Sequence, residues 1–213
     1  MLASIGIFGG TFDPIHYGHL RLAEEAREAL SLEQIVLIPS GQPPHRDAPQ
    51  TPANHRLAMA RLAAAGNPSL SVDPAEVESA TPSYSVLTLE RLRAQFGLAR
   101  PLVLLLGADA FAGLASWYRW RELFALAHIA IANRPGHEMQ AHSAPLAAEC
   151  DPRLATRAED LRNAPAGHIL PFEMTPLAIS ASLIRARLAA GQSVRYLLPD
   201  SVLDYIRSRH LYT

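Results

Sequence analysis

The chain has 213 residues, of which 49% are hydrophobic and 18% are charged, and its formal net charge is −1. This composition predicts a globular protein with a sizeable core and excludes a disordered chain, a collagen and a small disulfide-built domain. The near-neutral charge argues against a general nucleic-acid-binding protein, which would show a basic excess. All 19 lysine-or-arginine positions are arginine, so a bound phosphate would be contacted by arginine, histidine or backbone N–H groups.

The sequence also carries expectations about location. The start at residues 1–4 has neither a basic lead nor a cleavable apolar core, which is not the pattern of a signal peptide. The apolar runs are shorter than the roughly 20 residues that a membrane span needs. Cys150 is the single cysteine and cannot form an internal disulfide. We therefore expect a cytoplasmic protein that contacts neither membrane nor nucleic acid.

The predicted elements alternate between apolar segments and helical patterns. In chain order, we expect a strand at 4–8, a helix from 19 to 30, a strand at 34–38, helices at 51–66 and 85–96, strands at 101–106 and 128–132, an irregular stretch at 133–166, a short strand at 168–170 and helices at 180–190 and 199–209. Strands that are apolar throughout and separated by helices predict a doubly wound, Rossmann-like α/β fold, with a parallel sheet and helices on both faces. We expect one domain over residues 1–213, with a small C-terminal helical portion from about 175 to 213.

Ligands in such folds bind at the carboxyl ends of the strands, and the segment after the first strand has the pattern of a phosphate site. Gly9 and Gly10 allow a ligand to approach the backbone, and Gly18 opens a helix whose first N–H groups favour an anion. His16 and His19 are spaced so that both rings reach the same spot. Ordinary loop histidines or a metal pair are the alternatives, but no cysteine or carboxylate stands nearby at zinc-ligand spacing.

A second helix start is expected at Ser180, with Ser182 in its first turn and Arg185 about one turn further on. Hydroxyl groups, backbone N–H groups and a guanidinium group would suit a polyphosphate. Taken alone, the same residues are typical of an ordinary capped surface helix, and it is the pairing with the first loop that favours a phosphate site.

Other candidate residues also follow predicted strands. The pair His45 and Arg46 fits either a phosphate contact or a solvated loop, and Asp109 fits either a ribose contact or a helix cap. Arg134 could meet a substrate phosphate. The N–H groups at Tyr84 and Ser85, where a helix is expected to begin, could bind a carboxylate.

These motifs resemble the nucleotidyltransferase superfamily with its H-x-G-H pair, and specifically the bacterial nicotinate-nucleotide adenylyltransferase family. The resemblance covers essentially the whole chain through the long first motif and four further segments. They are residues 9–19 (GGTFDPIHYGH), 40–46 (SGQPPHR), 82–85 (PSYS), 107–109 with 117–118 (GAD and WY), and 179–185 (ISASLIR).

The resemblance implies that ATP and nicotinate mononucleotide react to nicotinate adenine dinucleotide and pyrophosphate in NAD biosynthesis. The implied catalytic residues are His16, His19, Arg46 and Arg185. The implied ATP-binding residues are Gly9, Gly10, Thr11, Phe12, His16, Gly18, His19, Gly107, Asp109, Ile179, Ser180, Ser182 and Arg185. The implied mononucleotide-binding residues are Thr11, Ser40, His45, Tyr84, Ser85, Asp109, Trp117, Tyr118 and Arg134. Mg²⁺ is implied as the cofactor, held mainly by ATP phosphates and water rather than by side chains.

Departures at three positions and four alternatives accompany the resemblance. Ser85 and Ser182 stand where threonine is commoner, and Ser40 stands where some members have an amide side chain. The alternatives are a sibling adenylyltransferase that uses phosphopantetheine, one that uses nicotinamide mononucleotide, a cytidylyltransferase, and a non-catalytic nucleotide-sensing module. A homo-oligomer is compatible with all of them. Trp120 is expected to pack in the core, and the histidines without an implied role are expected to be structural or on the surface: His55, His128, His137, His142, His168 and His210.

Overall fold

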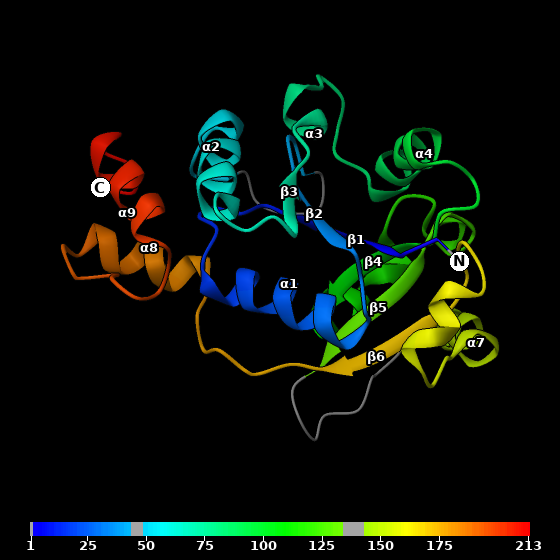
Figure 1. The fold of residues 1–213 in the computed structure, drawn as a ribbon. Helices are drawn as coiled ribbons and strands as arrows, with labels where there is room; N and C mark the ends of the chain where they lie inside the picture. The colour runs from blue at the N-terminus through cyan, green and yellow to red at the C-terminus, as the bar shows by residue number, and fades with distance from the viewer. Residues whose placement is uncertain (1, 44–48, 134–142) are drawn as a thin grey trace.

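The computed structural model describes residues 2–43, 49–133 and 143–213 (Figure 1). Its strands form one six-stranded sheet in the order β3-β2-β1-β4-β5-β6, and every neighbouring pair is parallel. The doubly wound fold predicted from the sequence is confirmed. The strands are β1 (Ile5–Gly10), β2 (Gln34–Pro39), β3 (Leu70–Val72), β4 (Leu102–Gly107), β5 (His128–Asn133) and β6 (Ile169–Glu173).

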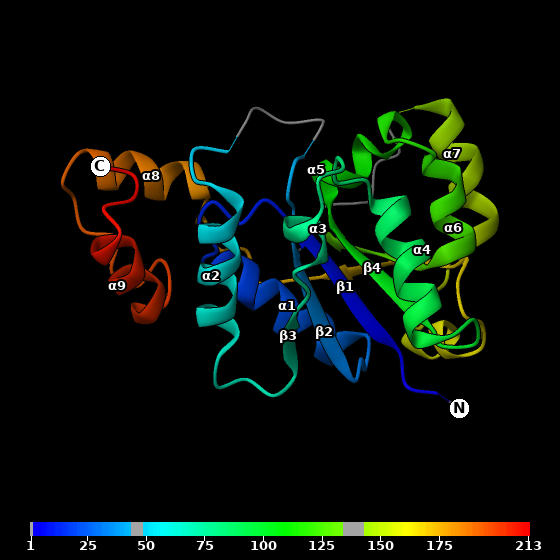
Figure 2. The same ribbon diagram turned by 90° about the horizontal axis from the view of Figure 1, so that it is seen from above.

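Helices cover both faces of this sheet, and the last two helices of the chain lie together at one end of the molecule. In Figures 1 and 2, α8 and α9 lie beside α2, away from α4 and α7. The helices are α1 (Tyr17–Ala29), α2 (Ala53–Ala64), α3 (Ala75–Glu78), α4 (Ser85–Phe96), α5 (Ala108–Ala112), α6 (Leu123–Leu126), α7 (Ala144–Cys150), α8 (Ala181–Ala189) and α9 (Asp200–Ser208). Within the described ranges, no helix combines the length and apolar character that crossing a membrane requires.

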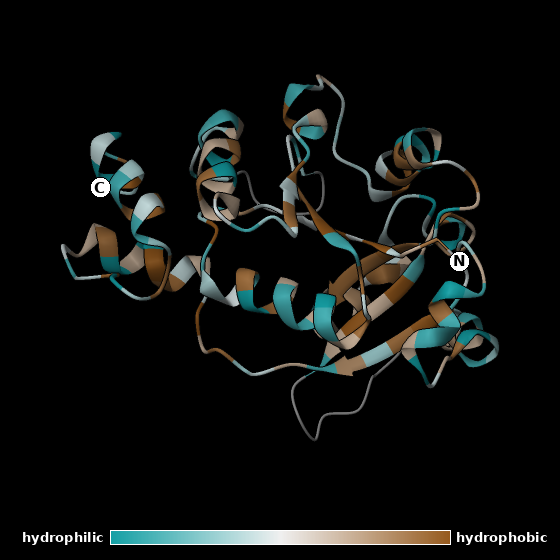
Figure 3. Cartoon of the chain, in the orientation of Figure 1, coloured by the Kyte–Doolittle hydropathy of each residue, from teal (hydrophilic) through white to brown (hydrophobic). Residues whose placement is uncertain are grey.

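The core consists of two apolar layers, one on each face of the sheet. Successive residues of a strand point to opposite faces, so Ile35 joins one layer and Val36 the other. The first layer packs the sheet against α1, α2, α8 and α9, and the second packs it against α4 to α7. Figure 3 shows the resulting apolar colouring along β4 and β5 and hydrophilic outer turns on α1. Trp120 is 8% exposed within the second layer, as the sequence predicted.

Three expectations about local structure were wrong in part. The three-residue strand β3 was missed because one short edge strand carries too little periodicity to be recognised. Residues 133–166 are not irregular throughout, since α7 packs Leu146 and Cys150 into the core at helical spacing. Helix α2 spans Ala53–Ala64 with Pro52 as its N-cap, so it is two residues shorter at each end than the expected helix at 51–66.

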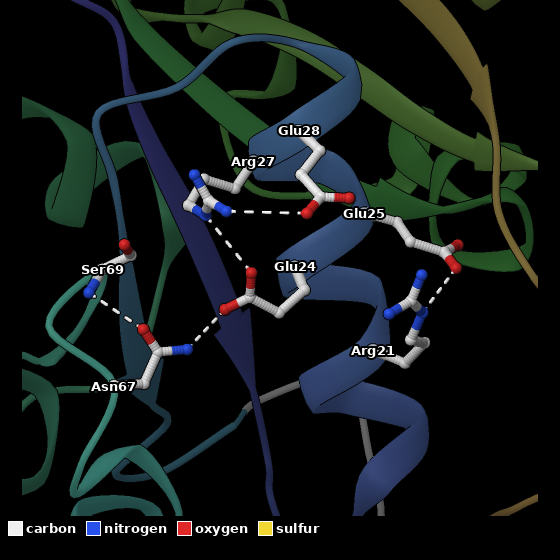
Figure 4. Close-up of polar contacts among 7 residues, drawn as sticks. All are labelled: Arg21, Glu24, Glu25, Arg27, Glu28, Asn67 and Ser69. Atoms are coloured by element: carbon white, nitrogen blue, oxygen red, sulfur yellow. Dashed lines mark hydrogen bonds and ion pairs between the residues drawn. The ribbon is translucent and has the colours of Figure 1, made fainter.

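The outer face of α1 is held by charged and amide side chains (Figure 4). Arg21 and Glu25 pair at 2.6 Å one turn apart, and Arg27 pairs with Glu24 at 3.2 Å. Asn67 donates to Glu24 and accepts from the Ser69 N–H group, which ties α1 to the turn before β3. Exposed ion pairs of this kind contribute roughly 0.2–1 kcal/mol each, so the apolar layers remain the main source of stability.

A buried arginine lies at the end of the sheet where the strands begin, and it bonds to the backbone there. Arg93 of α4 is 6% exposed, and its guanidinium donates to the carbonyl groups of Leu126, Arg100 and Pro165. These carbonyl groups lie just before β5, β4 and β6. One cation therefore donates to three backbone acceptors, of which the Pro165 carbonyl also accepts from the Leu102 N–H group.

We expect Arg93→Lys to lower the free energy of unfolding by roughly 2–4 kcal/mol, because an ammonium cannot reach three divergent carbonyl groups and leaves some of them unpaired. Urea unfolding followed by circular dichroism measures the change. Turnover by the folded variant should stay at the wild-type level, since these contacts lie at the edge opposite the candidate site. A variant as stable as the wild type would show that the three bonds are not needed.

Candidate active site

The candidate site lies at the carboxyl ends of β1, β2 and β4. The loop from Thr11 to His16 leaves β1 and turns sharply at Phe12, whose φ of +50° is unusual for a side chain of this size. The Phe12 ring is 2% exposed and packs edge-on against the His19 ring, with 5.1 Å between the centroids. The turn at Phe12 thus buries an aromatic ring beneath the histidine pair and fixes the path of the loop.

His16 and His19 together cap the amino end of α1. The Gly18 N–H donates to His16 Nδ1 at 3.1 Å, and the His16 N–H donates to His19 Nδ1 at 3.3 Å. A neutral imidazole accepts on one nitrogen and carries its proton on the other. Both rings therefore hold their proton on Nε2, which makes each Nε2 a hydrogen-bond donor.

The two rings lie against each other, as their spacing in the sequence predicted. Their centroids are 3.7 Å apart and the ring planes differ by 27°. Burial lowers the pKa of His16 to about 4, so this ring is neutral near pH 7. The site thus offers N–H donors at a helix N-terminus, where the helix dipole favours an anion.

The amino end of α8 lies next to the histidine pair. A Cβ at Gly18 would lie 2.9 Å from the His16 ring, which is too close, and 3.5 Å from the Ile179 carbonyl, which is an ordinary contact, so Ile179 lies beside Gly18. Ser180 caps α8 by accepting from the Leu183 N–H group at 3.2 Å. The structure therefore brings the first and last predicted motifs together.

Arg185 reaches from α8 to the loop after β1. Its Nη1 donates to the Asp13 carbonyl at 2.8 Å, and its Nη2 lies 3.4 Å from the Ser182 hydroxyl. Its buried Nε has no hydrogen-bond partner among the described residues. The guanidinium is anchored on one side and keeps a donor for another group.

The segment after β2 lies alongside the first loop. The Ser40 N–H donates to the Gly10 carbonyl at 2.9 Å, and within the described chain the buried Ser40 hydroxyl has no partner. The Gly41 and Gln42 N–H groups donate to the Ser83 hydroxyl at 2.9 and 3.3 Å. Gly41 is needed here because a Cβ would lie 2.0 Å from the Glu76 carbonyl oxygen.

Aromatic residues gather on the other side of the site. The rings of Tyr84 and Tyr118 lie 4.6 Å apart, and Trp117 packs partly against the core beside them. Helix α4 begins at Ser85, with Tyr84 as N-cap and no side-chain cap bond at this end. Asp109 is exposed in the first turn of α5, and Gly107 is its N-cap.

The remaining predicted positions fall into three groups. Gly9 is exposed at the end of β1 with open space where a Cβ would be, and Thr11 is half-buried. His55, His128, His168 and His210 lie outside this cluster: His55 pairs with Tyr205, and His128 is fully buried. The residues outside the described ranges are His45, Arg46, Arg134, His137 and His142.

Three side chains that the sequence analysis did not assign also lie against the site. Asp13, Arg56 and Tyr212 bond to the loops after β1 and β2. Asp13 lies within the first motif, and this position was the signal in the sequence that pointed to a role for it. Arg56 sits in the helical pattern of α2 and Tyr212 at the chain end, and only their tertiary contacts distinguish them from surface residues.

Comparisons with known proteins agree with this geometry. A family model described as cytidylyltransferase-like matches residues 7–187. A Dechloromonas aromatica (strain RCB) protein named probable nicotinate-nucleotide adenylyltransferase is 56% identical over 214 residues, covering 100% of this chain and 99% of that protein. A protein of the same name from Pseudomonas putida (strain W619) is 48% identical over 98% of this chain and 94% of its own length. The solved structure of Plasmodium falciparum nicotinic acid mononucleotide adenylyltransferase complexed with NaAD has a TM-score of 0.72 at 17% identity, covering 99% of this chain and 97% of that one, and thus shares the fold.

We expect the free energy of unfolding to fall as the pH is lowered from about 7 to about 4. Burial lowers the pKa of His16 and of His128 to about 4, whereas the unfolded chain titrates these rings near about 6.5. Between these values the unfolded state binds more protons, so stability is fully present above about pH 6.5 and is lost towards pH 4. Each ring contributes a slope of at most about 1.4 kcal/mol per pH unit, which urea unfolding across this range measures.

The variant His16→Asn isolates one of these contributions. Asparagine still caps a helix but does not titrate, so the slope should become shallower than in the wild type. The exposed His210→Asn is the control and should leave the slope unchanged. An unaltered slope in His16→Asn would show that the His16 ring is not held neutral by the fold.

Proposed function

This chain belongs to the nicotinate-nucleotide adenylyltransferase family, and we propose that it transfers the adenylyl group of ATP to nicotinate mononucleotide, forming nicotinate adenine dinucleotide and pyrophosphate. The observation that carries the proposal is the stacked pair His16 and His19 at the start of α1, beside the start of α8. Two helix N-termini and two imidazole N–H donors in one place suit a triphosphate.

The chemistry needs positioning and charge stabilisation rather than a covalent nucleophile. A phosphate oxygen of the mononucleotide attacks the α-phosphorus of ATP, and the bond from that phosphorus to the bridging oxygen breaks to release pyrophosphate. The attacking phosphate is already an anion at pH 7, since its second pKa is about 6, so no general base is required. The barrier comes from bringing two anions together and from charge moving onto the leaving group.

We assign the histidine pair to the α-phosphate and its bridging oxygen. Both rings carry their proton on Nε2, because Nδ1 of each accepts a backbone N–H group. Neutral donors of this kind are preorganised and need no change of protonation during the reaction. Phe12, which packs against His19, keeps the ring in place.

The start of α8 is assigned to the β- and γ-phosphates. Arg185 is fixed to the Asp13 carbonyl and keeps its Nε for a further partner, while Ser180 and Ser182 stand in the first turn. Members of such transferase families generally use a divalent metal, and we propose Mg²⁺ held by phosphate oxygens and water. This fits the donor set, because the surrounding side chains are imidazole, guanidinium and hydroxyl groups. When bound, the ion neutralises phosphate charge.

The aromatic side of the site is assigned to the mononucleotide. Trp117 and Tyr118 would pack on the pyridine ring, and the N–H groups at the start of α4, at Tyr84 and Ser85, would bind its carboxylate. That carboxylate contact would select nicotinate over nicotinamide. Asp109 would accept from ribose hydroxyls, and Gly107 leaves room beside it. The buried Ser40 hydroxyl, which has no partner among the described residues, is assigned to the same ligand. His45, Arg46 and Arg134 remain predictions for the phosphate contacts.

Pyrophosphate release tests the proposed function. The protein is mixed with ATP and Mg²⁺ and, in separate reactions, with nicotinate mononucleotide, nicotinamide mononucleotide or phosphopantetheine. We expect the fastest release with nicotinate mononucleotide. Faster release with either other acceptor would assign the chain to a sibling reaction. ATP binding without release from any acceptor would favour a nucleotide-sensing module.

We expect His19→Ala to lower kcat by roughly 10²- to 10³-fold with a smaller change in KM, as for the loss of one transition-state donor. Steady-state pyrophosphate release measures both constants. His55→Ala is the matched control, because His55 bonds to Tyr205 between α2 and α9, away from the loops. Near-normal turnover of folded His19→Ala would remove this ring from the catalytic set.

A further inference from the structure

A fully buried arginine joins three backbone segments at the edge of the candidate site. The Arg56 residue is 1% exposed, and its guanidinium donates through all three nitrogens. Nη1 lies 2.7 Å from the Thr11 carbonyl, Nη2 lies 3.0 Å from the Gly41 carbonyl, and Nε lies 3.1 Å from the Thr51 carbonyl. One rigid, planar group thus ties Thr11, in the loop after β1, to Gly41 and to Thr51.

The carboxylate of Asp13 supplies the negative charge near Arg56. Tyr212, near the end of the chain, hydrogen-bonds to this carboxylate. Asp13 is 5% exposed, and its Oδ1 accepts from the Tyr212 hydroxyl at 2.6 Å. Its Oδ2 accepts from the Gln50 N–H at 2.9 Å, so the carboxylate also bridges the two loops. Burial and this bond raise the pKa of Tyr212, which therefore stays a protonated donor. Burial lowers the pKa of the Arg56 guanidinium, and the negative charge of Asp13 offsets part of this change by raising it.

The contacts of this cluster lead to the residues assigned to the reaction. Asp13 gives its backbone carbonyl to Arg185 and stands three residues before His16. Thr11 and Gly41 adjoin Gly10 and Ser40, which are bonded to each other. The side chains of Arg56, Asp13 and Tyr212 hydrogen-bond to residues of these loops. At 1% exposure, the Arg56 guanidinium is not placed to bind substrate.

We propose that Arg56, Asp13 and Tyr212 form a buried clasp that positions the loops after β1 and β2, and thereby aligns the two phosphates for in-line attack. The proposal rests on the proposed function, since it concerns the same reaction. Charge-assisted hydrogen bonds in a buried site are strong and directional, and together they resist relative movement of the loops. A misplacement of about 1 Å can cost about 100-fold in rate, so the clasp acts on the transition state more than on the binding of either substrate.

The first test compares Arg56→Lys with Arg93→Lys. Both arginines are buried and donate to three carbonyl groups, but Arg93 lies at the opposite edge of the sheet. We expect both variants to lose stability. Only Arg56→Lys should also lose kcat, by about 10- to 100-fold, with both KM values within about threefold of the wild type.

The second test compares Tyr212→Phe with Tyr205→Phe. Each change removes one buried hydroxyl contact made by the C-terminal region, since Tyr205 bonds to His55 Nδ1 at 2.9 Å. Only Tyr212→Phe should lower kcat. Phenylalanine keeps the shape of the side chain, so this variant serves where Arg56→Lys does not fold.

Amide hydrogen exchange provides a readout that does not depend on activity. The amides of Gln50 and of residues 11–13, 15 and 16 should exchange at least about tenfold faster in Tyr212→Phe, and should be unchanged in Tyr205→Phe. A wild-type protein that releases no pyrophosphate would end the proposed function, while the exchange data would still decide whether the clasp holds the loops. Unchanged exchange and unchanged kcat in Tyr212→Phe, or equal losses of kcat in both members of a pair, would overturn the proposal.

Discussion

The hydrogen bonds that His16 and His19 accept from backbone N–H groups determine the chemistry open to this site. Each bond occupies Nδ1, so the proton of each ring stays on Nε2 and becomes a donor. The same bonds satisfy N–H groups at the start of α1, which would otherwise be unpaired. The same two hydrogen bonds therefore stabilise the start of the helix and determine the tautomer of each ring.

Neutral imidazoles suit a reaction between two anions. Burial keeps His16 uncharged near pH 7. In the proposed reaction the attraction for phosphate would therefore come from N–H dipoles and the helix N-terminus, with Arg185 supplying formal charge. Such donors are fixed before the substrates arrive and need no reorganisation in the transition state. The chain has no lysine, so in the proposed function arginines take both the phosphate-binding and the structural roles.

Two buried arginines show how the same chemistry serves different purposes at the two edges of the sheet. Arg93 donates to three carbonyl groups before the strands begin, and Arg56 donates to three carbonyl groups at the opposite edge. Their side chains satisfy backbone acceptors in similar ways. Only the groups near Arg56 adjoin the candidate site, so position in the fold rather than residue type separates structural support from positioning.

The sequence by itself determined the parallel fold and the first phosphate motif. Apolar strands and helical periodicity act over a few residues, and the spacing of His16 and His19 places them on one helix start whatever the rest of the chain does. The short strand β3 and the short helix α7 were missed because three and seven residues are too few to establish a period in the sequence. The tertiary structure alone decided the meeting of α1 with α8, the pairing of Tyr84 with Tyr118 and the contact of Tyr212 with Asp13. These contacts join residues from 34 to 199 positions apart, and a distance of that kind is fixed by how the layers pack, which no local pattern records.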